Sequence, residues 1–585
     1  MDTQTTRTTS ASRTLPPLAT LIVSAVLLVC VFAVLSAISL RFQPGSEPAE
    51  RPVLAMLGLI GVAFIAYLIA LRAALKVREG RPLMAVILLS SVLIRGVSLF
   101  SWPILEVDIY RYIWDGAAVL QGVSPYDYSP QQVRVAGTEW LLPEAMRRLV
   151  DLRDGSTSLE TILNRIHYGE LTTIYPPVSQ AVFASAVLVT PGDAGVFEYV
   201  LAMKSVLVLF DVATLVVILG LLRLTRKHMG WSVAYGWCPL VIKEIANAGH
   251  LDSVAVFLST LALYFAVKPL GNARQGRTVQ AQTVAAAMLL ALAVGAKLYP
   301  IVLAPMLVVL WSRVTSWRWA SFVAVLFVAA TTVVLWPLLP ANDNGYPPDA
   351  RHAVADGTEP LPPDAAADVV RQTPSGGLQA FLKRWEMNDF LFMLVVENLK
   401  PSAGVEPARQ PWFAVTPESW KAGLISNSSR WIPFDENEVA FALARLVTGI
   451  VFLLIGASLL WRASSSSDAA TWLRVAFLTL AWFWLLSPTQ NPWYWTWALP
   501  LVMFARSRAW LAMSGLAMMY YLRFWFVYQW PDQPVLNTSY AGAAFFDFVV
   551  TWIEFGPWLV LLAWRFRPLC QSREGKKTGL FQVPV

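Results

Sequence analysis

The feature that most constrains this chain is a series of apolar runs, each about as long as a helix that crosses a bilayer. A spanning helix needs about 20 mostly apolar residues. Our interpretation counts fourteen such runs: 16–40, 53–75, 82–104, 198–224, 231–247, 250–268, 280–296, 298–314, 318–339, 438–462, 469–487, 492–506, 509–528 and 544–566. The sequence therefore predicts an all-α polytopic membrane protein with about 14 transmembrane helices, between 13 and 15.

The composition excludes a soluble or a disordered protein. Hydrophobic residues make up 56% of the 585 residues and charged residues only 14%, well below the roughly 25% usual in soluble domains. Aromatic residues reach 12%, which disordered chains do not. The first apolar run is too long for the core of a signal peptide, and we expect it to be retained as a helix. Cys30, Cys238 and Cys570 lie far apart, so neither a disulfide framework nor a metal cluster is indicated.

The basic residues predict the orientation of the chain. Lys and Arg exceed Asp and Glu by 45 to 38, and they form short clusters between the apolar runs. This placement is typical of cytoplasmic loops rather than of nucleic-acid binding, so no nucleic-acid partner is expected. If all clusters are cytoplasmic, the crossings alternate on the condition that another apolar run, 175–192, does not cross. We therefore expect both termini in the cytoplasm and 175–192 at the exoplasmic face; alternatively, one cluster breaks the rule and this run crosses.

This topology divides the chain into tails, membrane modules and two large exoplasmic loops. Loops of this length in a compact fold are usually functional. No internal repeat is evident, which disfavours transporters built from duplicated halves. The predicted parts are a cytoplasmic tail 1–15, an N-terminal transmembrane module 16–339 that includes the exoplasmic loop 105–197, a large exoplasmic loop 340–437, a C-terminal bundle 438–566 and a cytoplasmic tail 567–585.

The first motif whose side chains could take part in a reaction follows the third apolar run. Glu106 and Asp108 place two carboxylates at the membrane–water boundary. If 108–120 is helical, Asp108, Tyr112 and Asp115 share a face, with Arg111 adjacent to both carboxylates. Asp108 would also lie near the helix start, where the helix dipole stabilises negative charge. The alternative is structural: Asp108 caps the helix and pairs with Arg111.

Further polar motifs interrupt the apolar runs, and the predicted topology brings them to the same outer face. A shared cavity is therefore expected, although each motif taken singly is explained by helix breaking or interfacial anchoring. The segment 376–388 has the pattern of an amphipathic helix whose Lys383 and Arg384 could hold an anionic lipid phosphate, or simply form a solvated edge. The other motifs are Tyr175-Pro176-Pro177, Gly249-His250-Leu251-Asp252, Lys297-Leu298-Tyr299-Pro300 and Asn491-Pro492-Trp493-Tyr494.

Ionisable residues also lie within or near the apolar runs. Lys204 and Asp211 are seven residues apart and so share a helix face. Charges at membrane depth are costly unless they are paired. We interpret most of them as satisfied structural pairs: Arg95, Lys204, Asp211, Lys243, Glu244, Arg445, Asp547 and Glu554.

Taken in order, these motifs resemble the GT-C superfamily of membrane glycosyltransferases, and within it the polyprenol-phosphate-mannose-dependent mannosyltransferases. The resemblance spans roughly 82–505. It implies a multi-pass enzyme that takes a sugar from a lipid-linked phosphate donor on the exoplasmic side. It also implies a catalytic carboxylate in the first large outer loop, which maps onto Glu106-Val107-Asp108, with Asp108 preferred. Where the family often has Gly-His-Asn-Asp, this chain has Leu251 in place of the amide.

The chemistry assigns roles to these residues. Displacing a lipid phosphate from an anomeric carbon needs a base for the attacking hydroxyl and positive charge near the departing phosphate. Asp108 is the expected base, with Glu106 and Asp115 as supporting acids. The expected phosphate-binding residues are Arg111, Lys297, His250, Lys383 and Arg384, and the expected substrate-lining residues are Tyr112, Trp114, Tyr175, Asp252, Tyr299, Trp493 and Tyr494. No cofactor is expected; a divalent metal beside Glu106 and Asp108 is conceivable but not predicted.

The sequence thus predicts a glycosyltransferase of the cell (inner) membrane that moves a sugar, mannose favoured, from a polyprenyl-phosphate donor to an exoplasmic glycan, glycolipid or protein. An inverting single displacement needs the fewest parts, although a retaining mechanism with a second carboxylate stays open. The first rival is a transporter or flippase of lipid-linked sugars, which would share the helices and buried charges. The second is a non-catalytic protein that uses its outer loops as a binding surface.

Overall fold

The computed structural model describes residues 16–137, 142–271, 276–338, 376–402, 410–430 and 435–565, and this part of the chain is helical throughout, without a strand. Among these residues, ten helices are long and apolar enough to cross a membrane. The protein is therefore a multi-pass membrane protein. The main helices of the ten spans are α1 (Pro17–Ile38), α2 (Val53–Ala74), α3 (Arg81–Leu99), α9 (Val196–Leu224), α12 (Asp252–Val267), α13 (Arg277–Ala296), α15 (Trp317–Leu335), α20 (Glu436–Ala463), α21 (Ala469–Leu486) and α26 (Thr551–Arg565), the last preceded by α25 (Gly542–Phe545) and η11 (Phe546–Val550).

The remaining four of the predicted runs are helical but short or interrupted. In three of these runs, prolines begin or interrupt the helical pieces, because proline lacks the N–H that an uninterrupted helix needs. They are Pro239, Pro300, Pro492 and Pro500. Irregular backbone at membrane depth is tolerated where it is buried in protein, and the first of these runs is buried along most of its length. The pieces are η3 (Met229–Ser232), α10 (Val233–Gly236), α11 (Pro239–Val241) and η4 (Ile242–Asn247); η6 (Tyr299–Leu303) and α14 (Ala304–Val314); α22 (Pro492–Trp495) and η9 (Leu499–Phe504); and α23 (Arg508–Leu516), η10 (Ala517–Tyr521) and α24 (Leu522–Gln529).

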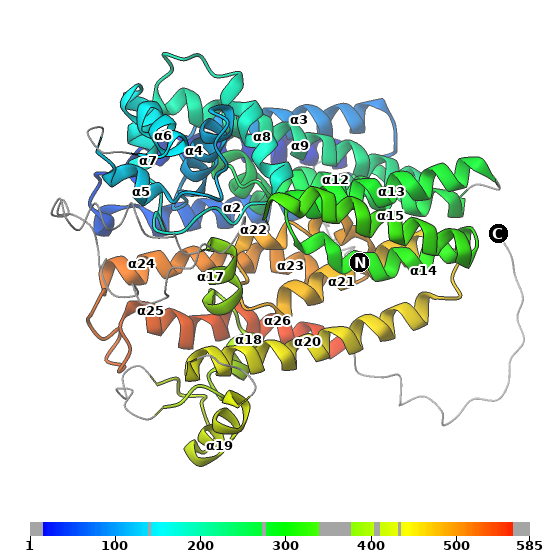
Figure 1. Ribbon diagram of the computed structural model, residues 1–585. Coiled ribbons are helices and arrows are strands. Elements are labelled where there is room, and N and C mark those ends of the chain that lie inside the picture. The colour runs from blue at the N-terminus through cyan, green and yellow to red at the C-terminus, as the bar shows by residue number, and fades with distance from the viewer. Residues whose placement is uncertain are drawn as a thin grey trace, which may run out of the picture.

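A cap of short helices covers one end of the bundle (Figure 1). Its helices are α4 (Asp108–Leu120), α5 (Pro130–Val135), α6 (Glu144–Asp154), α7 (Thr157–Asn164) and α8 (Pro177–Leu188). Gly116 allows α4 to pack closely on α8, because a Cβ at this position would lie 2.6 Å from the Phe183 carbonyl carbon. The α8 helix has 12 residues and is about 18 Å long, which is shorter than the roughly 30 Å hydrocarbon core of a bilayer.

A second part of the cap comes from the region between α15 and α20. It contains α17 (Gly377–Arg384), α18 (Leu391–Val396) and α19 (Glu418–Ser429), so the predicted helix over 376–388 is present over eight residues. The segment after α17 docks on the turn after α21: the Met387 N–H donates to the Pro488 carbonyl at 3.0 Å, and the Gln490 N–H donates to the Met387 carbonyl at 3.0 Å. This docking joins two regions about 100 residues apart in the chain.

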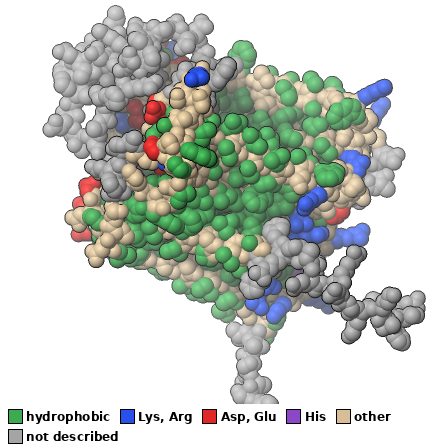
Figure 2. All heavy atoms as spheres, turned by 90° about the horizontal axis from the view of Figure 1, so that it is seen from below, with side chains coloured by type: hydrophobic (Ala, Val, Ile, Leu, Met, Phe, Trp, Pro, Cys, Tyr) green, Lys and Arg blue, Asp and Glu red, His purple; other side chains and the backbone are tan. Residues whose placement is uncertain are grey.

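Basic side chains gather at the end of the bundle opposite the cap, whereas hydrophobic side chains cover much of the side of the bundle that Figure 2 shows. Many of the exposed arginines lie in the first or last turn of these helices or in the connections between them. They include Arg72, Arg78, Arg81, Arg277, Arg313, Arg318, Arg462 and Arg508.

Most of the charged residues predicted inside the bundle are paired, whereas Lys204, Arg445 and Glu554 form no ion pair among the described residues. The Arg95 Nε of α3 donates to the Asp211 Oδ2 of α9 at 2.5 Å, and the Tyr235 hydroxyl donates to Asp211 Oδ1 at 2.7 Å. Lys204 does not pair with an acid. Its ammonium group donates to the carbonyls of Ser98, Leu99 and Ser101, where α3 ends and its last carbonyls lack helical partners.

Candidate functional site

A cavity of about 1000 Å³ lies where the cap meets the bundle. Residues from both parts of the cap and from the ends of several spans form its wall. The predicted residues on the wall are Glu106, Asp108, Arg111, Tyr112, Tyr175, Lys297, Tyr299, Trp493 and Tyr494. The structure therefore brings together motifs that are separated by up to nearly 400 residues in the sequence.

Asp108 is the first residue of α4, and its side chain does not cap the helix. Among the described residues, its hydrogen-bond partner is Tyr175, whose hydroxyl donates to Asp108 Oδ2 at 3.3 Å. The Tyr175 ring packs edge-on against Tyr112, with ring centroids 5.0 Å apart. The structural alternative, in which Asp108 caps the helix and pairs with Arg111, does not describe this arrangement. The carboxylate lines the cavity, and no Lys, Arg or His side chain of the described residues forms an ion pair with it.

Arg111 pairs with the other carboxylate of α4. Its Nε donates to Asp115 Oδ1 at 2.9 Å, and the Gln180 amide of α8 donates to Asp115 Oδ2 at 3.2 Å. Asp115 is 2% exposed and lies behind the cavity wall. Arg111, expected next to both carboxylates, thus pairs with Asp115, which lies one turn further along α4, and the Gln180 hydrogen bond links this pair to α8. Trp114 is likewise buried in the core rather than on the wall.

Lys297 follows α13 and forms an ion pair with Asp252, the first residue of α12. Its ammonium group donates to both carboxylate oxygens at 2.8 and 2.7 Å, and the Trp497 indole also donates to Asp252, at 2.5 Å. The ammonium group has three donors, so one remains after Asp252 is bound. The Lys297 side chain is 17% exposed and lies on the cavity wall, whereas Asp252 is buried behind it. The aromatic rings of Tyr299 and Tyr494 stack on Trp497 at 4.0 and 4.5 Å.

We expect Lys297→Ala to have two separable effects. It leaves the Asp252 carboxylate buried without its cation, which should cost about 3–5 kcal/mol of unfolding free energy. It also removes a positive charge from the cavity and should raise the KM for an anionic donor about tenfold. Unfolding and donor titration check the two effects. Adding Asp252→Asn should restore much of the stability but not the KM, and a double variant with normal KM would exclude Lys297 from donor binding.

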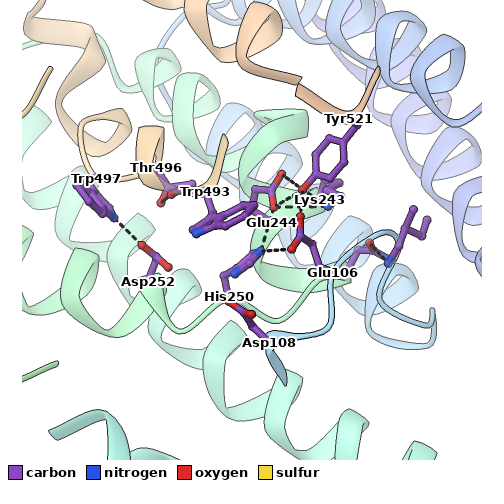
Figure 3. Close-up of polar contacts among 12 residues, drawn as sticks. Glu106, Asp108, Lys243, Glu244, His250, Asp252, Trp493, Thr496, Trp497 and Tyr521 are labelled. Atoms are coloured by element: carbon purple, nitrogen blue, oxygen red, sulfur yellow. Dashed lines mark hydrogen bonds and ion pairs between the residues drawn. The ribbon is translucent and has the colours of Figure 1, made fainter. Parts of the chain in front are cut away.

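A second polar group lies beside the cavity and contains five side chains from four regions of the chain (Figure 3). The Tyr521 hydroxyl oxygen lies 3.0 Å from Glu106 Oε1 and 3.0 Å from each Glu244 carboxylate oxygen, and it accepts a hydrogen bond from Lys243. The His250 Nε2 lies 3.4 Å from Glu244 Oε2 and 4.0 Å from Glu106 Oε2, within ion-pairing range of both. Of these five, Glu106 is on the cavity wall.

His250 is held in place behind the cavity wall. Its ring stacks on Trp493 with centroids 4.2 Å apart, and Trp493 itself lines the cavity. The preceding Gly249 has a φ of +76°, and a Cβ there would lie 2.6 Å from the Ile109 side chain. Only glycine therefore fits this turn. His250 does not line the cavity but contacts two residues that do, Glu106 and Trp493.

The surroundings of this group raise the pKa values of Glu106 and His250. Burial raises the pKa of Glu106 to about 7, although Lys243 and His250 lower it. Burial lowers the pKa of His250, but the carboxylates of Glu244, Glu106 and Asp108 outweigh burial and raise the pKa above its ordinary value. Glu106 is therefore the wall carboxyl whose protonation changes near neutral pH.

This pKa predicts how stability depends on pH. Because burial favours protonated Glu106, the folded state binds more protons than the unfolded state between pH 4.5 and about 7. Stability should therefore fall as pH rises through this window, by roughly 3 kcal/mol, and level off above it. Unfolding of wild type and Glu106→Gln across pH 4–8 measures the effect. The Gln variant should lose most of this slope; equal slopes in both proteins would contradict the assignment.

The cavity wall is rich in positive charge. Among the described residues, six cations line it and two carboxylates, Glu106 and Asp108, do so. The cations are Arg51, Arg111, Arg165, Lys297, Arg445 and Arg523. This balance favours an anionic ligand. Sequence reasoning did not place Arg51, Arg165, Arg445 or Arg523 in the site. The side chains of Lys383 and Arg384, predicted to bind phosphate, lie outside the described residues.

In the part of the chain that the structure describes, no group of three or more His, Cys, Asp or Glu side chains is arranged to hold a metal ion. Cys30 is exposed and Cys238 is buried, both as free thiols, and Cys570 falls outside the described ranges. Comparison with family models, with curated proteins and with solved structures finds no match to this chain.

Proposed function

We propose that this protein is a membrane glycosyltransferase that moves a sugar from a polyprenyl-phosphate donor to an acceptor on the exoplasmic side. The observation that carries the proposal is the position of Asp108, a carboxylate that forms no ion pair among the described residues, on the wall of a large cavity that six cations and two carboxylates line. A base and a cationic surround are the two groups that displacement of a phosphate from an anomeric carbon needs. The motif resemblance favours mannose as the sugar.

The proposed reaction is a single inverting displacement. The acceptor hydroxyl oxygen forms a bond to the anomeric carbon while Asp108 takes its proton. The bond between the anomeric carbon and the phosphate oxygen breaks, and its electron pair leaves with the lipid phosphate. Lys297 supports the departing phosphate with its remaining donor, and Tyr175 orients the base through its hydrogen bond to Asp108.

The aromatic wall supports binding of sugars. Trp385, Trp493, Tyr494 and Tyr520 line the cavity, and aromatic rings pack well on the apolar faces of sugar rings. Trp385 belongs to the segment that docks on the turn after α21. We assign selection of the acceptor, whether glycan, glycolipid or protein, to this part of the cap.

The proposed topology has fourteen crossings in the cell membrane, with both termini in the cytoplasm and the cap outside. It counts the four interrupted runs as crossings and α8 as an exoplasmic helix. The concentration of arginines at the end opposite the cap supports it, because cytoplasmic loops are enriched in basic residues (Figure 2). A reporter fused after Gly192 should report an exoplasmic position, and a cytoplasmic readout would refute this topology.

The experiment that tests the proposed function is incubation of the purified protein with a panel of polyprenyl-phosphate sugars and candidate acceptors. Mass spectrometry then follows free polyprenyl phosphate and the glycosylated acceptor. We expect both products to form in equal amounts with at least one donor, mannose first. Turnover of a nucleotide-sugar donor in place of the lipid donor would contradict the proposal.

A further inference from the structure

Arg445 differs from the other cations of the cavity in having neither an ion pair nor a side-chain hydrogen bond among the described residues. It lies ten residues into α20, within a membrane-spanning helix, and lines the cavity. No carboxylate among the described residues pairs with it, and its Nε is buried without a hydrogen-bond partner. Its guanidinium lies 4.9 Å from the centroid of the Phe441 ring. An intramembrane arginine without a partner is costly and marks a functional site by default.

Arg445 stands at the head of a stripe along α20 that faces the cavity. Thr448, Gly449 and Phe452 line the same cavity, and they follow Arg445 at intervals of three, four and seven residues. This spacing places the four residues on one face of a helix. Thr448 donates its hydroxyl proton to the Ala444 carbonyl, so the stripe beyond Arg445 offers mainly apolar surface. Gly449 keeps it open, because a Cβ there would meet no atom within 4 Å.

Apolar residues from other elements line the same cavity, and together with the α20 stripe they form what we call the branch. Leu298, Ile301 and Val302 line it from the turn after α13 and from η6, and Phe483 lines it from α21. Ile301 is 48% exposed although it also lines the cavity. Among these four lining residues Ile301 alone is exposed, so this lining reaches the surface of the protein at Ile301.

We propose that this branch is a lateral entrance for an anionic membrane lipid, whose headgroup binds Arg445 and whose tail lies along Thr448, Gly449 and Phe452 toward the bilayer. The ligand has a negative headgroup joined directly to a long hydrocarbon chain. The headgroup supplies the negative charge that Arg445 lacks among its described neighbours. Gly449 provides the space for the hydrocarbon chain. As the donor entrance, this inference rests on the proposed function, but lipid binding itself does not require that sugar transfer occur.

The test is photo-crosslinking of the full-length protein in nanodiscs to a long-chain polyprenyl phosphate that carries a diazirine in its tail. We expect peptides of α20 near Gly449 to carry the label. Arg445→Gln should lower the yield about tenfold, the loss of one charge-assisted contact, and Arg445→Lys should recover part of it. The uncharged polyprenol with the same diazirine should show no dependence on Arg445.

A matched pair of variants tests the tail path. Gly449→Leu should block labelling, whereas Gly456→Leu should not, because Gly456 has equally open surroundings and does not line the cavity. Size-exclusion profiles establish that each variant is folded. If inorganic phosphate alone competes fully with polyprenyl phosphate for labelling, Arg445 binds a free anion, and the proposal of a lipid entrance is wrong. Labelling of other segments would overturn the proposal, and so would labelling that is unchanged in both Arg445→Gln and Gly449→Leu. Labelling as expected, but without sugar transfer, would refute the proposed function and leave the lipid entrance supported.

Discussion

Asp108→Asn is expected to lower the rate of sugar transfer about 10³-fold while the protein stays folded and inserted. Asparagine keeps the shape of the side chain and still accepts the hydrogen bond that Tyr175 donates at 3.3 Å. It cannot take a proton from the acceptor hydroxyl, so the attacking oxygen stays a poor nucleophile. Initial rates of polyprenyl-phosphate release, measured at saturating donor, give the effect on kcat directly.

The matched control for this substitution is Asp193→Asn, which makes the same chemical change at an exposed residue off the cavity wall. It should leave the rate within about twofold of wild type, since surface substitutions are usually near neutral. Near-normal kcat in Asp108→Asn would remove Asp108 from the mechanism. In that case Glu106, the other carboxylate of the wall, would become the residue to test.

A large loss of stability is expected for Arg95→Ala. The substitution leaves Asp211 fully buried between α3 and α9 without its cation. Breaking a buried pair in this way costs about 3–5 kcal/mol, because an uncompensated charge remains inside. Arg95 also donates to the Gly236 carbonyl at 2.7 Å, so the interrupted helix that begins near residue 233 loses a contact as well. Equilibrium unfolding in mixed micelles measures the loss.

The double variant Arg95→Met with Asp211→Leu separates charge from packing. Replacing both charges with apolar side chains should return most of the lost stability, since a buried pair contributes little over a well-packed apolar pair. Arg78→Ala, an exposed arginine between α2 and α3, is the control and should be nearly neutral. A double variant as unstable as Arg95→Ala would show that the charges are not the cause.

Much of the helical architecture could be predicted because long apolar runs identify spanning helices in the sequence. The helix predicted over 108–120 begins at Asp108 and ends at Leu120 in the structure. The interruptions at residues 239, 492 and 500 could not be predicted from composition. An apolar run broken by proline inside a protein core looks the same, residue for residue, as one that is a kinked helix in lipid.

The candidate site could be predicted only in part, for a related reason. Short motifs marked Asp108, Tyr175 and Lys297, because polar residues at helix breaks stand out against apolar surroundings. Tyr521 and Arg445 lie inside long apolar runs of the sequence with no motif around them. Tyr521 reaches Glu106 across 415 residues of sequence, and Arg445 reaches the cavity only through the packing of α20. Contacts of this kind are set by tertiary structure and leave no local signal.

Turnover in detergent micelles tests the central claim most directly, because an enzyme needs no sealed compartment whereas a transporter of lipid-linked sugars does. The purified protein in micelles, supplied with a polyprenyl-phosphate sugar and acceptor, should release polyprenyl phosphate continuously, and the Asp108→Asn protein should release almost none. Absence of release in micelles from every donor, together with movement of the intact lipid-linked sugar across proteoliposome membranes, would contradict the account.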